Sequence, residues 1–398
     1  MSKLRTIEDL GDLSGKKVLL RADLNVPVHE GRVTDLTRIQ SIKKTVLHLL
    51  KAGADVILLS HFERPGGKVV PKMSLAPLAP CLEDELDVPV KFVGDALDAK
   101  TAEAIAEGEG VFLVENLRFH PGEEKNLTSF AKKLAALGDL YINDAFSSTH
   151  RAHASIEGIT HHLPSAAGFA LIEEIEALET ALENPERPVA AVIGGAKIST
   201  KIATLENLVS KMDHLFLGGA MANTFLAARG ENIGASVSEP GLIEVAKRIM
   251  EKAEQAGCWI HLPIEVTVAK QMDATVGAIA LPLGAIEDDD MIFDIGPRAA
   301  DDYIRVLKRC KTVIWNGPLG AFEIRPFDRG TTQVARAIGN FTKKRKMISI
   351  AGGGDTVAAL YNAGAKWKFS HVSTAGGAFL EWLEGKTLPG IKALMSKG

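Results

Sequence analysis

The stretch MISIAGGGDT at positions 347–356 decides the fold class. An apolar run is followed at once by three glycines and then by Asp355 and Thr356. This order predicts a buried strand, a tight turn and the first turn of a helix. Similar apolar runs occur at 18–24, 54–61, 91–95, 111–116 and 140–146, and again at 189–195, 214–219 and 312–317. Amphipathic segments separate them, so we predict an α/β protein with doubly wound parallel sheets.

The length of the chain favours two domains. Its 398 residues exceed the roughly 250–300 at which single cores stop growing. The segment LIEEIEALETALEN at 171–184 has helical spacing of apolar residues and precedes Pro185. We interpret it as a helix that connects the domains, and a crossover helix within one domain is the alternative. We expect a first domain at 1–170, the helix at 171–185 and a second domain at 186–377.

Composition and charge exclude several classes of protein. The formal net charge of −4 offers no general basic field for nucleic acid or membrane lipid. Three scattered cysteines, no long uncharged apolar run and no apolar leader favour a reducing, cytoplasmic location. The basic run at 343–346 is typical of a solvated helix end, and a nucleic-acid patch is the alternative.

The loops after the predicted strands differ between the two halves. In the first half they carry side chains suited to a small anion, because guanidinium forks grip phosphate and carboxylate oxygens. These are Arg21, Asp23, Asn25, Arg38, His61, Arg64, Asn116, Arg118, Asn143, Asp144, His150, Arg151 and His153. Since ligands of open α/β sheets bind beyond the carboxyl ends of the strands, we expect these side chains to converge.

In the second half the same loops carry glycine, at 194–195, 218–219, 317, 352–354 and 376–377. Glycine turns before helix N-termini suit the phosphates of a nucleotide, although each alone is ordinary turn geometry. Neither a Walker P-loop nor a complete dinucleotide fingerprint is present in the sequence. Asp355 is either a helix cap or a magnesium ligand. Lys197 and Lys201 are four residues apart, so we expect them on one helical face, either reaching one phosphate tail or simply exposed.

At RADLNVP (21–27), SHFERP (60–65), ENLRF (115–119), NDAF (143–146), HRAHAS (150–155), GGAKISTK (194–201), LGGAMANTF (217–225), WNGPLGAFE (315–323) and AGGGDT (351–356), the sequence closely resembles the phosphoglycerate kinase family. The matching segments keep the family's order and span almost the whole chain. The resemblance implies two Rossmann-like domains that face each other across a hinged cleft, with the segment 378–398 returning to the first domain.

The resemblance also implies roles for individual residues. The first domain would bind 3-phosphoglycerate or 1,3-bisphosphoglycerate through Asp23, Asn25, Arg38, His61, Arg64, Arg118 and Arg151. The second would bind MgATP or MgADP through Gly195, Lys197, Lys201, Gly219, Asn316, Glu323, Gly353, Gly354, Asp355 and Thr356, with Mg²⁺ held by Asp355. Arg38, Lys197, Lys201 and Gly376 would act on the transferred group.

The implied reaction is reversible, direct in-line phosphoryl transfer by a monomer. Its acceptor is a carboxylate, which is already ionised at neutral pH, so no general base is needed. Three motifs depart from the family pattern, at Phe62 with Glu63, at Asn223, and at Ala375 in TAGGA. A nicotinamide-dependent dehydrogenase, which would need the missing glycine fingerprint, and a catalytically silent scaffold are the competing interpretations.

Overall fold

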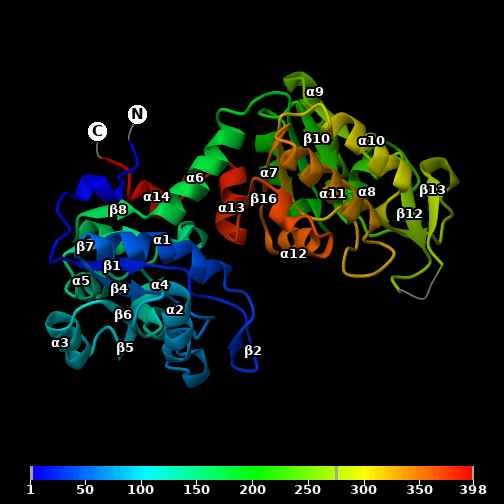
Figure 1. Cartoon of the computed structure of the whole chain (residues 1–398). Coiled ribbons are helices and arrows are strands. Elements are labelled where there is room, and N and C mark those ends of the chain that lie inside the picture. Colours follow the sequence, from blue (N-terminus) through cyan, green and yellow to red (C-terminus); the bar gives the residue numbers. More distant parts are fainter. Residues whose placement is uncertain (1–2, 274–276, 397–398) are drawn as a thin grey trace. The chain divides into compact units, whose positions relative to one another are not determined.

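The computed structural model describes residues 3–273 and 277–396, and it divides into two compact units (Figure 1). The first unit takes the residues up to Ile175 together with those from Thr387 onward. The second unit is Glu176–Lys386. Each contains its own six-stranded parallel sheet, which confirms the predicted α/β class.

The sheet of the first unit has the strand order β5-β6-β4-β1-β7-β8. Its strands are β1 (Lys17–Arg21), β4 (Asp55–Leu59), β5 (Val90–Gly94), β6 (Val111–Val114), β7 (Leu140–Asn143) and β8 (Ser165–Ala167). Neighbours are parallel throughout, and β1 pairs with β4 and β7. Val18, Leu19 and Leu20 are all fully buried although successive side chains point to opposite faces, so both faces of this sheet are covered.

Helices of the first unit are α1 (Thr37–Lys51), α2 (Ala79–Leu86), α3 (Ala99–Glu107), α4 (Pro121–Glu124) and α5 (Thr128–Ala135). A two-stranded hairpin, β2 (Val28–His29) with β3 (Arg32–Val33), precedes α1. Apolar residues of α1 recur at helical spacing, and Ile39, Ile42 and Val46 pack in one core with β1 and β4. The helix therefore holds the loop after β1 against the sheet.

The second unit repeats this plan with the order β11-β10-β9-β15-β16-β17. Its strands are β9 (Val189–Ile193), β10 (His214–Leu217), β11 (Trp259–His261), β15 (Thr312–Asn316), β16 (Ile348–Ala351) and β17 (His371–Val372). An antiparallel sheet of β12 (Glu265–Ala269), β13 (Ile279–Pro282) and β14 (Met291–Ile295) is added to it, and the sequence had not predicted this sheet.

Helices of the second unit are α7 (Ile202–Leu208), α8 (Ala220–Ala228), α9 (Ile243–Ala256), α10 (Pro297–Leu307), α11 (Arg329–Lys343), α12 (Gly354–Asn362) and α13 (Gly376–Leu383). Its main core joins β9, β15 and β16 to α10 and α11, and includes the fully buried Trp315. The predicted strand, glycine turn and helix at 347–356 are confirmed by β16 and α12.

Two segments cross the boundary between the units. Helix α6 (Phe169–Leu182) contains the boundary, and it begins and ends two residues before the expected 171–184. On the return, α13 stays in the second unit, because it packs on α7 and the Leu383 carbonyl accepts a hydrogen bond from Asn207 at 2.7 Å. The first unit resumes at Thr387, later than the expected 378, and contains α14 (Pro389–Lys392).

Among the described residues, no helix combines the length and apolar character needed to cross a membrane. Cys81, Cys258 and Cys310 are free thiols.

Candidate functional site

The first unit gathers polar side chains at the carboxyl edge of its sheet. Asp23 follows β1, His61 follows β4, Arg118 follows β6 and Ser147 follows β7. All these strands are parallel, so their carboxyl ends lie at the same edge. The sheet order places β4 and β7 on opposite sides of β1, which makes the loop after β1 the centre of the edge.

Arg38 is held by the loop that follows β1. Its guanidinium lies 3.2 Å from Asp23 Oδ2 and donates to the Asn25 carbonyl at 2.6 Å. Ser147 donates to Asp23, and the Asn25 side-chain oxygen accepts from the Glu63 amide at 2.9 Å. The side chain of Arg38 is only partly exposed, so the cation is fixed in position before any anion arrives.

His61 ends a chain of buried hydrogen bonds. Arg21 donates to His61 Nδ1 at 2.8 Å and to the Ser155 hydroxyl at 2.9 Å, and Ser155 donates to Glu123 at 2.6 Å. Burial, aided by Arg21, holds the pKa of His61 well below its usual value, while burial raises the pKa of Glu123. Because Nδ1 accepts, the neutral His61 ring carries its proton on Nε2 and presents a donor to an anion.

Arg118, Arg151 and His153 extend this cationic surface. Arg118 is buried, donates to the Glu63 carbonyl at 2.9 Å and lies 3.3 Å from Glu124. Burial and the nearby Arg21 cation lower its pKa to about 10, so it stays charged at neutral pH. Burial and the same arginines lower the pKa of His153 to about 3. Neighbouring cations that destabilise one another in this way would be stabilised by a bound anion.

Arg64 and Arg151 are the more exposed of the remaining anion candidates. Arg64 follows β4 and faces solvent. Arg151 is half-buried, and its Nε lies 3.1 Å from His150 Nε2. Asn116 is instead used structurally, since its amide donates to the carbonyls of Phe62 and Met73.

In the second unit, glycine turns meet at the carboxyl edge. A Cβ atom on Gly194 would lie 1.8 Å from the Pro318 carbonyl oxygen, and one on Gly219 would lie 2.6 Å from the Gly195 oxygen. Gly219 also has φ of +67°, a conformation that favours glycine. The loops after β9, β10 and β15 therefore approach so closely that side chains are excluded, which leaves backbone N–H groups at this edge.

Lys201 is the central cation of this second edge. It donates to Asn316, whose amide donates to the Gly352 carbonyl at 2.7 Å, so the loops after β9, β15 and β16 are joined. Burial lowers the pKa of Lys201 to about 8, and the nearby Asp355 opposes this shift. A phosphate would be attracted to this partly desolvated ammonium group more strongly than to an exposed one.

The helical-face interpretation of Lys197 and Lys201 is wrong. Lys197 has an extended backbone before the short 3-10 turn Ile198–Thr200, and Lys201 lies just before α7. Against the effect of burial, hydrogen bonds from Ser199 lower the pKa of Glu239, and the nearby Lys197 cation adds to this shift. The two lysines come from a loop, because the glycine turn after β9 delays the start of the helix.

The turn after β16 has the groups expected at a nucleotide phosphate. Gly353 has φ of +98°, and Gly354 and Asp355 open α12. The Thr356 hydroxyl accepts from the Gly317 amide at 2.7 Å, which ties this turn to the loop after β15. Asp355 is exposed and close enough to Lys201 to influence its pKa, so its carboxylate is available to a magnesium ion beside phosphates.

Three further candidates lie around this edge. Gly376 is the first residue of α13, after the departure at Ala375, which is buried with an extended backbone. Glu323 is exposed in the loop after β15. Asn223, the other departure in this unit, lines a small cavity with Gly219 and donates to the Val237 carbonyl at 3.0 Å.

Comparison with known proteins gives one consistent answer. The family model described as Phosphoglycerate kinase matches residues 7–386. The chain belongs to the phosphoglycerate kinase family. It is 52% identical over 396 residues to "Phosphoglycerate kinase" of Agrobacterium fabrum, covering 99% of both chains. It is 53% identical over 393 residues to the Zymomonas mobilis enzyme of that name, covering 98% of this chain and 99% of the relative.

Solved structures agree with this family. Phosphoglycerate kinase from Coxiella burnetii has a TM-score of 0.91 and 41% identity, with 98% of this chain and 99% of that chain covered. The chain is therefore a nucleotide-dependent kinase, a phosphotransferase with a carboxyl acceptor, whose general role is in glycolysis.

Several contacts at the phosphoglycerate kinase edges were missed by sequence reasoning. Ser147 supports Asp23, and Ser155 with Glu123 of α4 supports Arg21, from segments far along the chain. Serine and glutamate are common in exposed loops, so their types carry little signal. The carboxylates that follow ENLRF, at Glu123 and Glu124, were the one available indication, because acidic groups beside clustered arginines are often ion-pair partners.

Proposed function

We propose that this phosphoglycerate kinase moves a phosphoryl group reversibly between 1,3-bisphosphoglycerate with ADP and 3-phosphoglycerate with ATP. The observation that carries the proposal is the contrast between the two loop edges. One presents guanidinium and imidazole groups, which suit a compact, highly charged anion. The other presents glycine turns around a half-buried lysine, which suit a nucleotide. We assign phosphoglycerate to the first unit and the nucleotide to the second.

In the first unit we assign substrate contacts to seven residues, Asp23, Asn25, Arg38, His61, Arg64, Arg118 and Arg151. The Arg38 geometry supports this assignment, since Asp23 and the Asn25 carbonyl hold the cation at the centre of the edge. His61 supports it also, as a neutral donor backed by Arg21.

In the second unit we assign nucleotide contacts to Gly195, Lys197, Lys201, Gly219, Asn316, Glu323, Gly353, Gly354, Asp355 and Thr356. Asp355 would hold Mg²⁺, which neutralises charge on the nucleotide phosphates when bound. Support comes from the exposed carboxylate in the first turn of α12, beside a glycine turn and Lys201.

Direct in-line transfer is the mechanism that these groups favour. The acceptor carboxylate is ionised without help, so the protein has to position two anions and offset the charge of the moving group. Arg38, Lys197, Lys201 and the N-terminus of α13 at Gly376 are assigned to that charge. The two sets of contacts belong to separate units, and we propose that α6, which contains the boundary, acts as a hinge during transfer. We further propose a cytoplasmic monomer.

Arg38→Ala tests the assignment of the transferred group. If Arg38 acts mainly in the transition state, kcat falls by about 10²-fold or more while KM for 3-phosphoglycerate changes little. Steady-state kinetics measure both constants. Arg32→Ala, an exposed arginine of β3, is the matched control and is expected to leave both unchanged. A variant in which only KM rises would contradict the assignment.

A further inference from the structure

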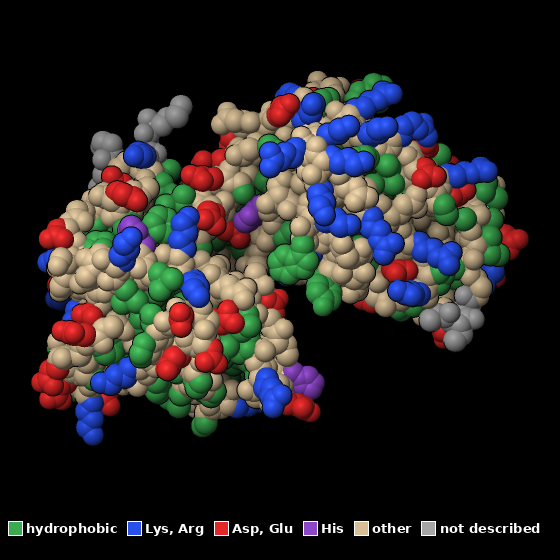
Figure 2. All heavy atoms as spheres, in the orientation of Figure 1, with side chains coloured by type: hydrophobic (Ala, Val, Ile, Leu, Met, Phe, Trp, Pro, Cys, Tyr) green, Lys and Arg blue, Asp and Glu red, His purple; other side chains and the backbone are tan. Residues whose placement is uncertain are grey.

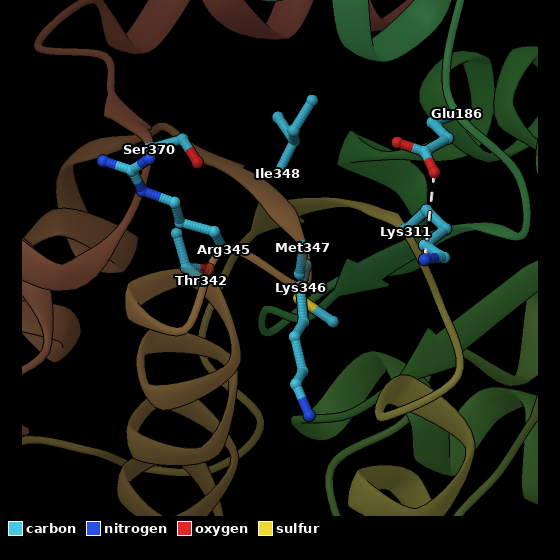
Figure 3. A pocket seen from close by; sticks show the side chains of 8 residues that line it. All are labelled: Glu186, Lys311, Thr342, Arg345, Lys346, Met347, Ile348 and Ser370. Atoms are coloured by element: carbon cyan, nitrogen blue, oxygen red, sulfur yellow. Dashed lines mark ion pairs between the residues drawn. The ribbon is translucent and has the colours of Figure 1, made fainter.

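A basic pocket lies in the second unit, away from the glycine turns. Its volume is about 340 Å³, in the range of small-molecule sites. Its polar lining consists of Glu186, Lys311, Thr342, Arg345, Lys346 and Ser370. Figure 3 shows Arg345 and Ser370 on one side and Lys311 with Glu186 on the other, with Met347 and Ile348 between them.

The pocket belongs to the amino edge of the sheet. Lys311 comes just before β15, Met347 just before β16 and Ser370 just before β17. The nucleotide candidates follow the carboxyl ends of the same strands, at Asn316 and after Ala351. Each strand separates the two positions by its own length, so the pocket is distinct from the nucleotide edge.

Positive charge at this pocket is poorly compensated. Lys311 lies 3.8 Å from Glu186, a long and exposed ion pair. Across residues 3–273 and 277–396, no carboxylate forms an ion pair with Arg345 or Lys346 within 4.0 Å. Between positions 303 and 370 the sequence has thirteen lysines and arginines but only three acidic residues, Glu323, Asp328 and Asp355. Figure 2 shows blue side chains gathered over α10 and α11 on this unit.

Arg345 is also held in an unusual backbone conformation. Its φ is +54°, just after α11 ends, where glycine is the usual residue. The Arg345 amide donates to Thr342 O at 2.7 Å and the Lys346 amide donates to Phe341 O at 3.2 Å, the hydrogen-bond pattern of a Schellman motif. The left-handed residue costs stability, and Arg345 and Lys346 both line the pocket. Such strain is concentrated at functional positions.

Hydroxyl groups complete the lining. Ser370 Oγ accepts from the Ser349 amide at 3.1 Å, and its own O–H has no acceptor among the described residues. Thr342 shares a hydrogen bond of 2.7 Å with Ser349. A fixed hydroxyl donor beside a guanidinium group is a combination that binds phosphate oxygens.

We propose that this pocket is a second anion site, which binds a small anion with two adjacent phosphoryl groups. Cations on two opposite sides of the pocket suit a diphosphate better than a single compact anion. Single-stranded nucleic acid is less suitable, because its sites stack bases on aromatic rings, and none of the eight described residues that line this pocket is aromatic.

Lysine labelling of the full chain tests the site with inorganic pyrophosphate as the probe. An acylating reagent at low dose, read for each lysine by mass spectrometry, reports the reactivity of Lys311 and Lys346. Their labelling rates should fall roughly tenfold at a free pyrophosphate concentration about ten times its dissociation constant. Lys344, exposed in the same basic run but outside the lining, is the internal control and should keep its rate.

Arg345→Gly is the matched variant, since glycine suits the backbone there and folding should be retained. The variant should keep kinase activity and weaken pyrophosphate protection of Lys311 and Lys346 about tenfold or more, as expected for loss of a charged hydrogen bond. Equal protection in the variant, equal protection of Lys344, or equal protection by sulfate at matched ionic strength would overturn the proposal. So would equal protection by orthophosphate, or protection by an oligonucleotide but not by pyrophosphate.

Discussion

If Lys201 binds the nucleotide as proposed, the burial of this one residue sets the pH dependence of the reaction. Its ammonium group is largely desolvated among the loops after β9, β15 and β16, and its pKa is lowered to about 8. The amine is charged below that pKa and neutral above it, so attraction for nucleotide phosphate is lost as pH rises. We therefore expect kcat/KM for the nucleotide to fall on the alkaline side with an apparent pKa near 8.

The substitution Lys201→Arg tests whether deprotonation of Lys201, and not of another group, causes the alkaline fall in kcat/KM. Arginine keeps its charge far above pH 8, so the alkaline limb should move upward even if the maximal rate is lower. Lys211→Arg, on a half-buried lysine paired with Glu183 away from the glycine turns, is the control and should leave the profile unchanged. Initial rates from pH 6 to 10 measure the effect, and an alkaline limb that stays in place in Lys201→Arg would exclude Lys201 as its origin.

At Arg345, the backbone conformation of a single residue lowers the stability of the folded chain. A left-handed conformation costs an arginine free energy that glycine does not have to overcome. Arg345→Gly should therefore raise the free energy of unfolding of the second unit by about 1 kcal/mol. Urea unfolding followed by tryptophan fluorescence measures this change, because Trp259, Trp315, Trp367 and Trp382 all belong to that unit. A less stable variant would show that the arginine is not strained.

At the scale of elements, Asp144 connects the sheet of the first unit to helix α6. Its Oδ1 accepts from the Leu171 amide at 3.0 Å in the first turn of α6, and burial raises its pKa to about 6. The folded state therefore binds more protons than the unfolded state between the unfolded pKa of about 3.9 and pH 6. The contribution of Asp144 to stability is full below that window and declines as pH rises through it, by about 1.4 kcal/mol per pH unit.

Asp144→Asn should remove this dependence while still accepting from Leu171. The stability of the variant relative to the native chain should rise with pH and level off above about pH 6. Hydrogen exchange of β1 and β7 amides reports the first unit separately from the second. Thr128→Ala, in α5, serves as a variant without a titrating group. A relative stability that is flat from pH 4.5 to 7 would contradict the raised pKa.

The sequence predicted well those strands whose formation depends on one local property, a continuous run of apolar residues. Strands such as β1 and β15 are buried on both faces and are continuous apolar runs, so they are visible without neighbours. The two-residue β17 and the three-residue β8 are too short for a pattern. The antiparallel β12, β13 and β14 depend on pairing with one another, which local sequence does not encode.

For the site residues too, the local sequence indicated positions but not the contacts between distant segments. Residue types in the segments after the strands indicated Arg38 and His61 for the first sheet and Lys201 and Asp355 for the second, because segments that follow parallel strands meet at one edge of their own sheet. Which atoms meet was not predictable, since Lys201 with Asn316 and Arg21 with Ser155 join loops more than 100 residues apart. The Lys197 error has a similar origin, because a spacing of four residues matters only after a helix has begun.

At the scale of the molecule, the two units repeat one sheet plan with opposite chemistry at their carboxyl edges. Guanidinium groups that destabilise one another favour a compact anion in the first unit. Glycine turns that exclude side chains favour a phosphate chain in the second. In the proposed in-line transfer the carboxylate acceptor needs no base, so the chemistry rests on both anions being bound by one molecule.

The most direct test is ATP-dependent phosphorylation of 3-phosphoglycerate, with the acyl phosphate trapped by hydroxylamine, in the presence and absence of Mg²⁺. We predict that hydroxamate forms only when 3-phosphoglycerate, ATP and Mg²⁺ are all present, and that omitting any one abolishes it. Folded protein that binds nucleotide yet forms no hydroxamate would contradict phosphoryl transfer to a carboxyl acceptor, and formation undiminished by removal of the metal would contradict the role of Asp355.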